Sequence, residues 1–153
     1  EVTSKYLTKN FSYCFIKKYD YPPILTLKSL KKEFTLGNAG KKININAIKV
    51  RHGLIDSVAY IINKKIAYVS DANEFYKKDF FKFKKLNYLI IDCLRYNKHP
   101  SHFNLEDVFK INKSLGPKKT ILTNLHSDLD YNELLKQLPN NIKPGYDGLT
   151  ITI

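Results

Sequence analysis

The sequence predicts an α/β fold in which helices cover a mixed sheet. Up to residue 65, short apolar runs typical of strands follow one another; beyond that point, strand-like runs alternate with helical patterns. The chain has 153 residues, of which 43% are hydrophobic and 13% aromatic, and this content excludes a disordered chain. We therefore expect one globular domain, residues 1–153, with a substantial core.

The strands are expected where apolar residues alternate with polar ones or form short unbroken runs. The run at 87–92 has the apolar character of a strand that is buried on both faces. The segment 5–32 has the weakest pattern, and we expect strands and loops there. The strands predicted after this segment span residues 43–50, 57–62, 65–70, 87–92, 119–125 and 149–153.

Three helices are expected from amphipathic patterns and capping residues. The first spans 73–84, where four phenylalanines occur. The second begins after Asn104, a good N-cap residue that an aspartate answers three positions later, and Gly116 supplies its end. A similar capping pattern opens the third helix at Asp130, and this helix runs through Leu138.

The chain is strongly basic, with a formal net charge of +12 that would raise its association with phosphate-bearing substrates or nucleic acid. Its lysines spread along the whole chain, however, which favours a solvated surface over a binding patch. No stretch approaches the roughly 20 apolar residues that span a bilayer, so we expect no membrane partner and a cytoplasmic location. Cys14 and Cys93 have no Cys-x-x-Cys spacing and indicate reduced thiols.

Histidines and one aspartate stand where predicted strands end. His52, Asp71 and His126 each follow such a strand, and strand ends meet at one edge of a sheet, where open sheets place ligands. Imidazole with carboxylate suits zinc, manganese or iron. A single histidine at a strand end is more often structural, so the combination carries the prediction. His99 and His102 lie together in Lys-His-Pro-Ser-His, and we expect His99 at the surface.

Arg51 and Arg95 are the two arginines among 26 basic residues, and each stands beside one of these motifs. A guanidinium at such a place can clamp a phosphate through two hydrogen bonds. The alternative for Arg95 is an ion pair with a nearby carboxylate such as Asp92. The sequence leaves both interpretations open.

Several of these motifs together resemble the C-terminal half of the metallo-β-lactamase fold, in the branch of ribonuclease Z and the cyclic-phosphate phosphodiesterases. The resemblance runs from about Cys14 to the end of the chain. It implies that the mixed sheet is the C-terminal half of an αββα sandwich. The motifs are Val50-Arg51-His52-Gly53, Ile66-Ala67-Tyr68-Val69-Ser70-Asp71, Leu89-Ile90-Ile91-Asp92-Cys93, Pro100-Ser101-His102-Phe103-Asn104-Leu105, the segment 123–131, and Pro144-Gly145-Tyr146-Asp147-Gly148-Leu149.

The resemblance implies a role for each candidate residue. His52 would ligate one divalent metal ion, zinc or manganese, and Asp71 would bridge to a second. The family carries its last histidine directly after the threonine of the segment 123–131, but Asn124 stands there and His126 follows two positions later. Positions two apart on a strand share a face, so either residue could hold the second metal. His102 would act at the substrate as a proton donor or phosphate ligand.

The implied function is two-metal hydrolysis of a small phosphodiester, with RNA as an alternative substrate and a thioester or lactam as a further one. Arg95 and His102 stand where a phosphate would need them. The family's leading His-x-His-x-Asp-His motif does not occur in these 153 residues. We therefore expect a fragment that lacks the N-terminal half and is inactive alone, from a whole protein that is an enzyme able to form a homodimer.

A second hypothesis from another class is a small basic nucleic-acid-binding module without catalysis. The charge and the eleven tyrosines, which could stack on bases, support it. This hypothesis predicts RNA binding with a steep salt dependence and no metal content.

Overall fold

The computed structural model describes residues 2–17, 20–38 and 40–152, and the chain divides into two compact units, residues 1–31 and 32–153, where the sequence predicts one domain. Within the described parts, no helix is long and apolar enough to cross a membrane.

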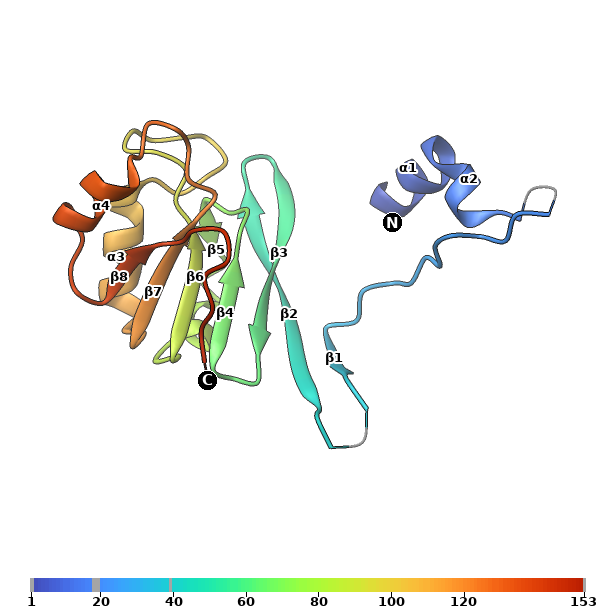
Figure 1. Ribbon diagram of the computed structural model, residues 1–153, viewed down its shortest axis with the longest axis horizontal. Helices are drawn as coiled ribbons and strands as arrows, with labels where there is room; N and C mark the ends of the chain where they lie inside the picture. Colours follow the sequence, from blue (N-terminus) through green and yellow to red (C-terminus); the bar gives the residue numbers. More distant parts are fainter. Residues whose placement is uncertain (1, 18–19, 39, 153) are drawn as a thin grey trace. The chain divides into compact units, whose positions relative to one another are not determined.

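The first unit contains two short helices, α1 (Val2–Asn10) and α2 (Ser12–Phe15) (Figure 1). Beyond α2, the backbone N–H groups of Ile24 and Leu25 both donate to the carbonyl of Cys14, which holds the following segment against that helix. The prediction of strands and loops over 5–32 was therefore wrong for the helices. Neither helix buries a residue, so no apolar stripe marked them in the sequence.

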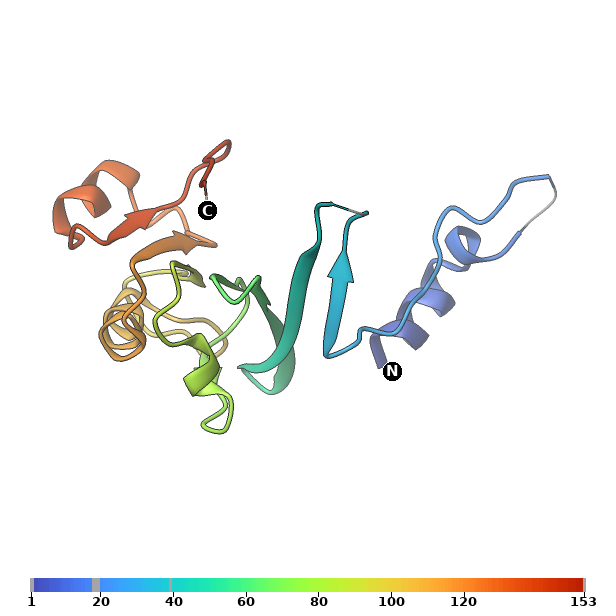
Figure 2. The same ribbon diagram turned by 90° about the horizontal axis from the view of Figure 1, so that it is seen from below.

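The described residues of the second unit form an eight-stranded mixed sheet in the order β1-β2-β3-β4-β6-β7-β8, with β5 paired to β2. Each of the first four strands is antiparallel to its neighbours among them, and β4, β6, β7 and β8 run parallel (Figures 1 and 2). Their bounds are β1 Glu33–Leu36, β2 Ile43–His52, β3 Ile55–Ile62, β4 Ile66–Val69, β5 Glu74–Phe75, β6 Tyr88–Asp92, β7 Lys119–Thr123 and β8 Ile142–Pro144.

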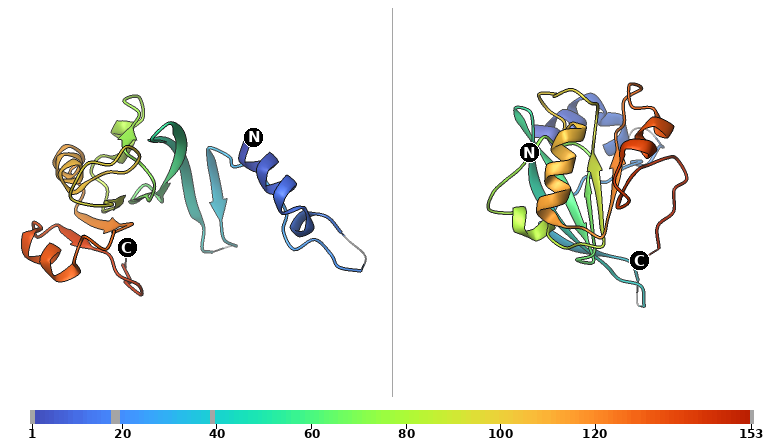
Figure 3. Two further views of the ribbon diagram at one scale, coloured as in Figure 1. Left: turned by 90° about the horizontal axis from the view of Figure 1, so that it is seen from above. Right: turned by 90° about the vertical axis from the view of Figure 1, so that its left-hand side faces the viewer.

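Helix α3 (Leu105–Leu115) lies against one face of this sheet (Figure 3) and connects β6 to β7. The side chain of Asn104 accepts a hydrogen bond from the Asp107 N–H at 2.9 Å, and Gly116 closes the helix with a left-handed φ of 59°. Both predictions for this helix are confirmed. Val108 and Leu115 are buried against strand residues that alternate toward the same face.

Helix α4 (Tyr131–Gln137) follows β7, and the Asp130 side chain caps it by accepting from two backbone N–H groups. The strand predicted at 149–153 is not found in its described part, 149–152, and Ile153 lies outside the described residues. The last strand is β8 instead.

The segment 73–84 is not the predicted helix, because it consists of β5 and a 3₁₀ helix, η1 (Phe80–Phe83). Phe75 pairs with Val50 across β2 and β5, and its ring contacts three other aromatic rings. Those rings belong to Phe80, Phe83 and Phe103. Three of the four phenylalanines that suggested a helix therefore converge through tertiary packing, whereas Phe81 is exposed.

Candidate metal site

Four polar residues lie where strands end at one edge of the sheet. His52 is the last residue of β2 and Asp92 the last of β6, while Asp71 and Asn124 follow β4 and β7. Strands β4, β6 and β7 are parallel, and two antiparallel pairings give β2 the direction of β4. The four residues consequently meet at the same edge. The sequence predicts this meeting from the strand ends for His52 and Asp71, but it names His126 as the third residue.

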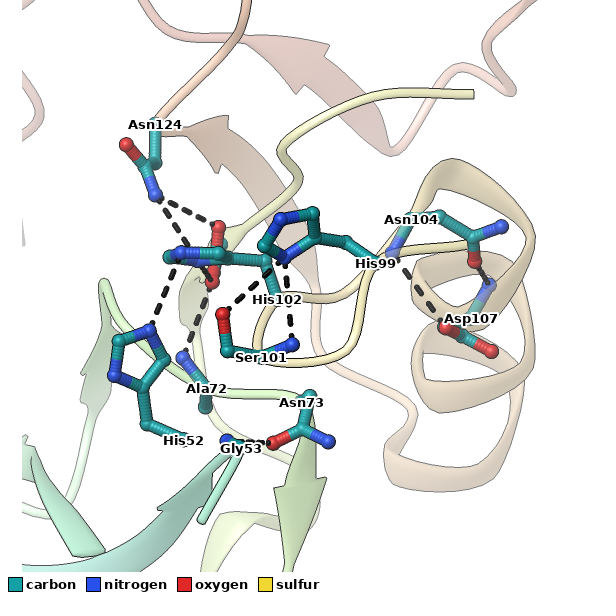
Figure 4. Close-up of polar contacts among 11 residues, drawn as sticks. His52, Gly53, Ala72, Asn73, His99, Ser101, His102, Asn104, Asp107 and Asn124 are labelled. Carbon is teal, nitrogen blue, oxygen red and sulfur yellow. Dashed lines mark hydrogen bonds and ion pairs between the residues drawn. The ribbon is translucent and has the colours of Figure 1, made fainter. Parts of the chain in front are cut away.

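Three of the candidate residues form one cluster of possible metal ligands. One ligand atom each from His52, Asp71 and His102 lies within 4.8 Å of the other two. The Nε2 atoms of His52 and His102 are 3.2 Å apart, with their ring planes at 68° (Figure 4). Zinc and manganese both bind imidazole nitrogen and carboxylate oxygen atoms, so these three residues fit a divalent metal ion.

Asp92 is buried behind this cluster and contacts three neighbouring residues through its carboxylate. Its fully buried carboxylate accepts from the Ala72 N–H at 3.1 Å and from the Asn124 side-chain amide at 3.1 Å. The same carboxylate lies 2.6 Å from Nδ1 of His102. Because Nδ1 then carries a proton, the Nε2 atom of neutral His102 keeps its lone pair toward His52. Burial raises the pKa of the Asp92 carboxyl above its ordinary value of 3.8, against the opposing effect of these donors.

Arg95 stabilises the loop that carries the histidines. Its Nε and Nη2 atoms donate to the backbone carbonyls of Asn97 and Lys98 at 3.3 and 2.8 Å. Within the described part of the chain, Arg95 makes no ion pair with Asp92, so that interpretation was wrong. The guanidinium fixes the loop next to the cluster, and its contact with a phosphate stays a prediction.

Arg51 lies away from the cluster, because successive residues of a strand point to opposite faces. Its guanidinium sits 5.6 Å from the ring centre of Tyr76. Its backbone carbonyl accepts from the Asn73 N–H, and the Asn73 side chain in turn accepts from the Gly53 N–H at 2.8 Å. Asn73 thus holds the turn after His52, a role that sequence reasoning missed although Asp-Ala-Asn follows the strand directly.

His99 lies beside His102, with ring centres 5.1 Å apart. It is half-buried rather than at the surface as the sequence suggested. Its Nδ1 atom accepts from the Ser101 N–H at 3.3 Å. Desolvation, followed by the charges of Arg95, His102 and His52, lowers the pKa of His99.

Asn124 and His126 are not equivalent in the structure. Strand β7 ends at Thr123, and Asn124 takes a left-handed φ of 60°, so the chain turns and the shared-face argument for these positions fails. Asn124 contacts Asp92 and lies 3.3 Å from His102 Nδ1. His126 is exposed and pairs with Asp128 at 3.1 Å, outside the cluster found among the described residues.

The chain belongs to the β-lactamase superfamily domain family, whose model matches residues 1–124. Its fold is that of the metallo-β-lactamases, as the resemblance implied. A structure of a diphosphatase from the PhnP family superposes with a TM-score of 0.82 at 26% identity, covering 97% of this chain and 54% of the other. Human tRNase Z, short form, gives a TM-score of 0.59 at 15% identity, covering 80% and 46%.

A protein named octanoyltransferase from Porphyromonas gingivalis is 30% identical over 142 residues, which cover 90% of this chain and 28% of that protein. The chain thus spans little more than a quarter of this relative and about half of the diphosphatase.

Proposed function

We propose that the chain forms part of a metal-dependent hydrolase that cleaves a small phosphodiester. The observation that carries the proposal is the His52–Asp71–His102 cluster at the ends of the strands, in a chain 26% identical to a diphosphatase of the same fold. Fold alone does not fix a substrate, but a cluster of imidazoles with Arg95 in the adjoining loop suits an anionic phosphoryl group.

The cofactors we propose are two divalent metal ions, zinc or manganese. When bound, they would supply Lewis acidity and a hydroxide nucleophile. His52 would hold one ion, Asp71 would bridge, and either Asn124 or His126 would contribute to the second. Asn124 is favoured by its place beside His102, whereas His126 would have to leave Asp128.

His102 could also ligate a metal by its position, but we assign it to the substrate side, because an Nε2 atom bound to metal could carry no proton. Asp92 holds its Nδ1–H, so a proton that reaches the ring sits on Nε2, which faces the cluster. From that atom the imidazolium can protonate the leaving oxygen of a phosphodiester, after which neutral His102 remains in the tautomer that Asp92 fixes.

A second candidate is the hydrolysis of an acyl ester or thioester. Its support is the name of the Porphyromonas relative, an enzyme of octanoyl transfer. The match covers 28% of that protein, so the name describes a much longer chain, and we rank this candidate second. RNA as a substrate, the cytoplasmic location and a homodimer stay predictions.

The test is metal content, measured by mass spectrometry on the full-length gene product and its single variants. We expect about two metal ions in the wild type, with loss in His52→Ala and Asp71→Ala. Comparing Asn124→Ala with His126→Ala identifies the remaining ligand. Turnover of phosphodiesters and thioesters by the loaded wild type then separates the two substrate classes.

A wild-type protein that holds no metal would contradict the proposal. Tight RNA binding that weakens steeply with salt would in that case favour the basic nucleic-acid-binding module.

A further inference from the structure

The loop between β6 and α3 places a second imidazole beside the candidate site. His99 and His102 come from this loop, and His52 lies on the other side of His102, at 4.6 Å between ring centres (Figure 4). The roles proposed so far use His52 and His102 and leave His99 without one.

The orientation of the His99 ring is fixed by its neighbour. The Ser101 N–H donates to Nδ1 at 3.3 Å, and the Ser101 hydroxyl lies 3.2 Å from the same atom. A backbone amide can only donate, so Nδ1 must be an acceptor, and neutral His99 carries its proton on Nε2. Among the described residues, Nε2 of His99 has no hydrogen-bond partner, so this N–H is available to a ligand.

The loop itself is held in place from two directions. Arg95 donates to the carbonyls of Asn97 and Lys98, directly before His99. Gly53, next to His52, packs so closely that a Cβ built on it would lie 3.1 Å from the Ser101 Cβ, and its φ of +61° also favours glycine. His99 is therefore a preorganised donor, and binding would not have to order its loop.

We propose that His99 binds the substrate, donating from Nε2 to a non-bridging oxygen of the phosphoryl group at the His52–Asp71–His102 cluster. The inference rests on the proposed phosphodiester hydrolysis and adds a residue to it. Because Nδ1 is occupied by Ser101, this ring presents a neutral donor that contacts the anion and leaves proton transfer to His102. His99 is thus a substrate-binding residue.

The first test reads the tautomer without any catalysis. Two-bond ¹H–¹⁵N correlation spectra of the labelled chain at a pH where the ring is neutral distinguish the two nitrogens of each histidine. We expect His99 in the Nε2–H form. An Nδ1–H form would overturn the inference, because the available atom would then be an acceptor that an anion repels.

The second test measures kcat and KM of the full-length, metal-loaded protein on a p-nitrophenyl phosphodiester. His99→Gln keeps an amide N–H near the position of Nε2, whereas His99→Asn keeps one near Nδ1 and His99→Ala keeps neither. A lost hydrogen bond to a charged oxygen should raise KM about 10- to 100-fold in the Ala and Asn variants, with kcat changed by less than about 3-fold. The Gln variant should recover most of the wild-type KM.

The matched control is Asn97→Ala, which alters an exposed side chain of the same loop and keeps the carbonyl that Arg95 contacts. It should leave KM unchanged. If the wild type is active and His99→Ala matches it, or if Gln fails to recover KM, the inference is wrong and the proposed function stands. If the metal-loaded wild type cleaves no phosphodiester, the proposed function fails. In that case, titration with inorganic phosphate tests whether His99 binds the anion. Equal phosphate affinity in the wild type and His99→Ala, or no phosphate binding by either, overturns the inference.

Discussion

Replacing Asp92 separates the geometry of its hydrogen bonds from its charge. In Asp92→Ala, the donors of Ala72, His102 and Asn124 lose their acceptor. Asn124 is exposed and can turn to water, whereas the Ala72 N–H is buried and His102 is mostly so. At about 1–3 kcal/mol for each of the two buried donors left unpaired, we expect the free energy of unfolding to fall by about 2–6 kcal/mol.

Asp92→Asn should behave differently. Its amide oxygen can accept from both Ala72 and His102, and its NH₂ group meets Asn124, whose own amide can flip to present an oxygen. We expect a stability loss of at most about 1 kcal/mol. The negative charge behind the cluster is gone, however, and with it its attraction for a divalent ion, so metal affinity should fall about 10- to 100-fold in this variant.

Urea unfolding of each variant gives the stability, and competition with a chelating dye in the full-length protein gives the metal affinity. Asn112→Ala is the control, because Asn112 accepts from Thr120 at 2.7 Å in a network on α3 outside the ligand cluster. It should lose stability and keep its metal affinity. Wild-type metal affinity in Asp92→Asn would refute the reasoning that the charge of the Asp92 carboxylate strengthens metal binding.

Two further predictions concern the fold. Asn104→Ala removes the capping side chain of α3 and should lower the free energy of unfolding by about 1 kcal/mol, seen as a lower urea midpoint; an unchanged midpoint would contradict the capping role. Burial raises the pKa of the Cys93 thiol to about 12 from 9.0, so iodoacetamide at pH 8 should modify Cys14 and spare Cys93 until urea is added. Because the folded pKa is the higher one, the stability from the Cys93 thiol is full below pH 9.0 and is lost as the pH rises toward about 12. Cys93→Ala should therefore show a shallower alkaline decline than the wild type, and equal slopes would show that burial does not perturb the thiol.

The elements that the sequence predicted well depend on contacts between near neighbours. Asn104 caps α3 through a bond three residues away, and Gly116 ends it through its own backbone conformation. The short apolar run of β6 needs a buried position and little else. In each of these cases, the residues that determine the element lie within one helical turn or one strand.

The predictions that were wrong concern segments whose conformation depends on contacts between residues far apart in the sequence. The phenylalanines after Asn73 suggested an amphipathic helix, but Phe75 pairs with Val50 on another strand, and that pairing determines its conformation. In the same way, the left-handed turn at Asn124 separates it from His126, and nothing in the order of the residues announces that turn.

The strand ends of the candidate site could be predicted from the pattern of the sequence, whereas His102, in the loop before α3, was expected only from the family resemblance. His52 and Asp71 follow strands whose direction topology fixes, so their meeting follows from the sheet. The approach of His99 to His102 depends on Ser101 and on the hold of Arg95 on the loop, which are side-chain contacts without a sequence period.

Because β2 pairs with strands on both sides, insertions and deletions within it would disturb the candidate site. His52 lies opposite Ile55 and Arg51 opposite Asp56, while β5 fixes Val50 against Phe75. Inserting a single codon within β2 before Arg51 would exchange the faces of Arg51 and His52 and put a guanidinium where the cluster has an imidazole, and deleting one would put Gly53 there. A change of two codons would restore the face but move the imidazole by about 7 Å along the strand. Lineages of this protein should therefore accept substitutions along β2 while keeping its length constant.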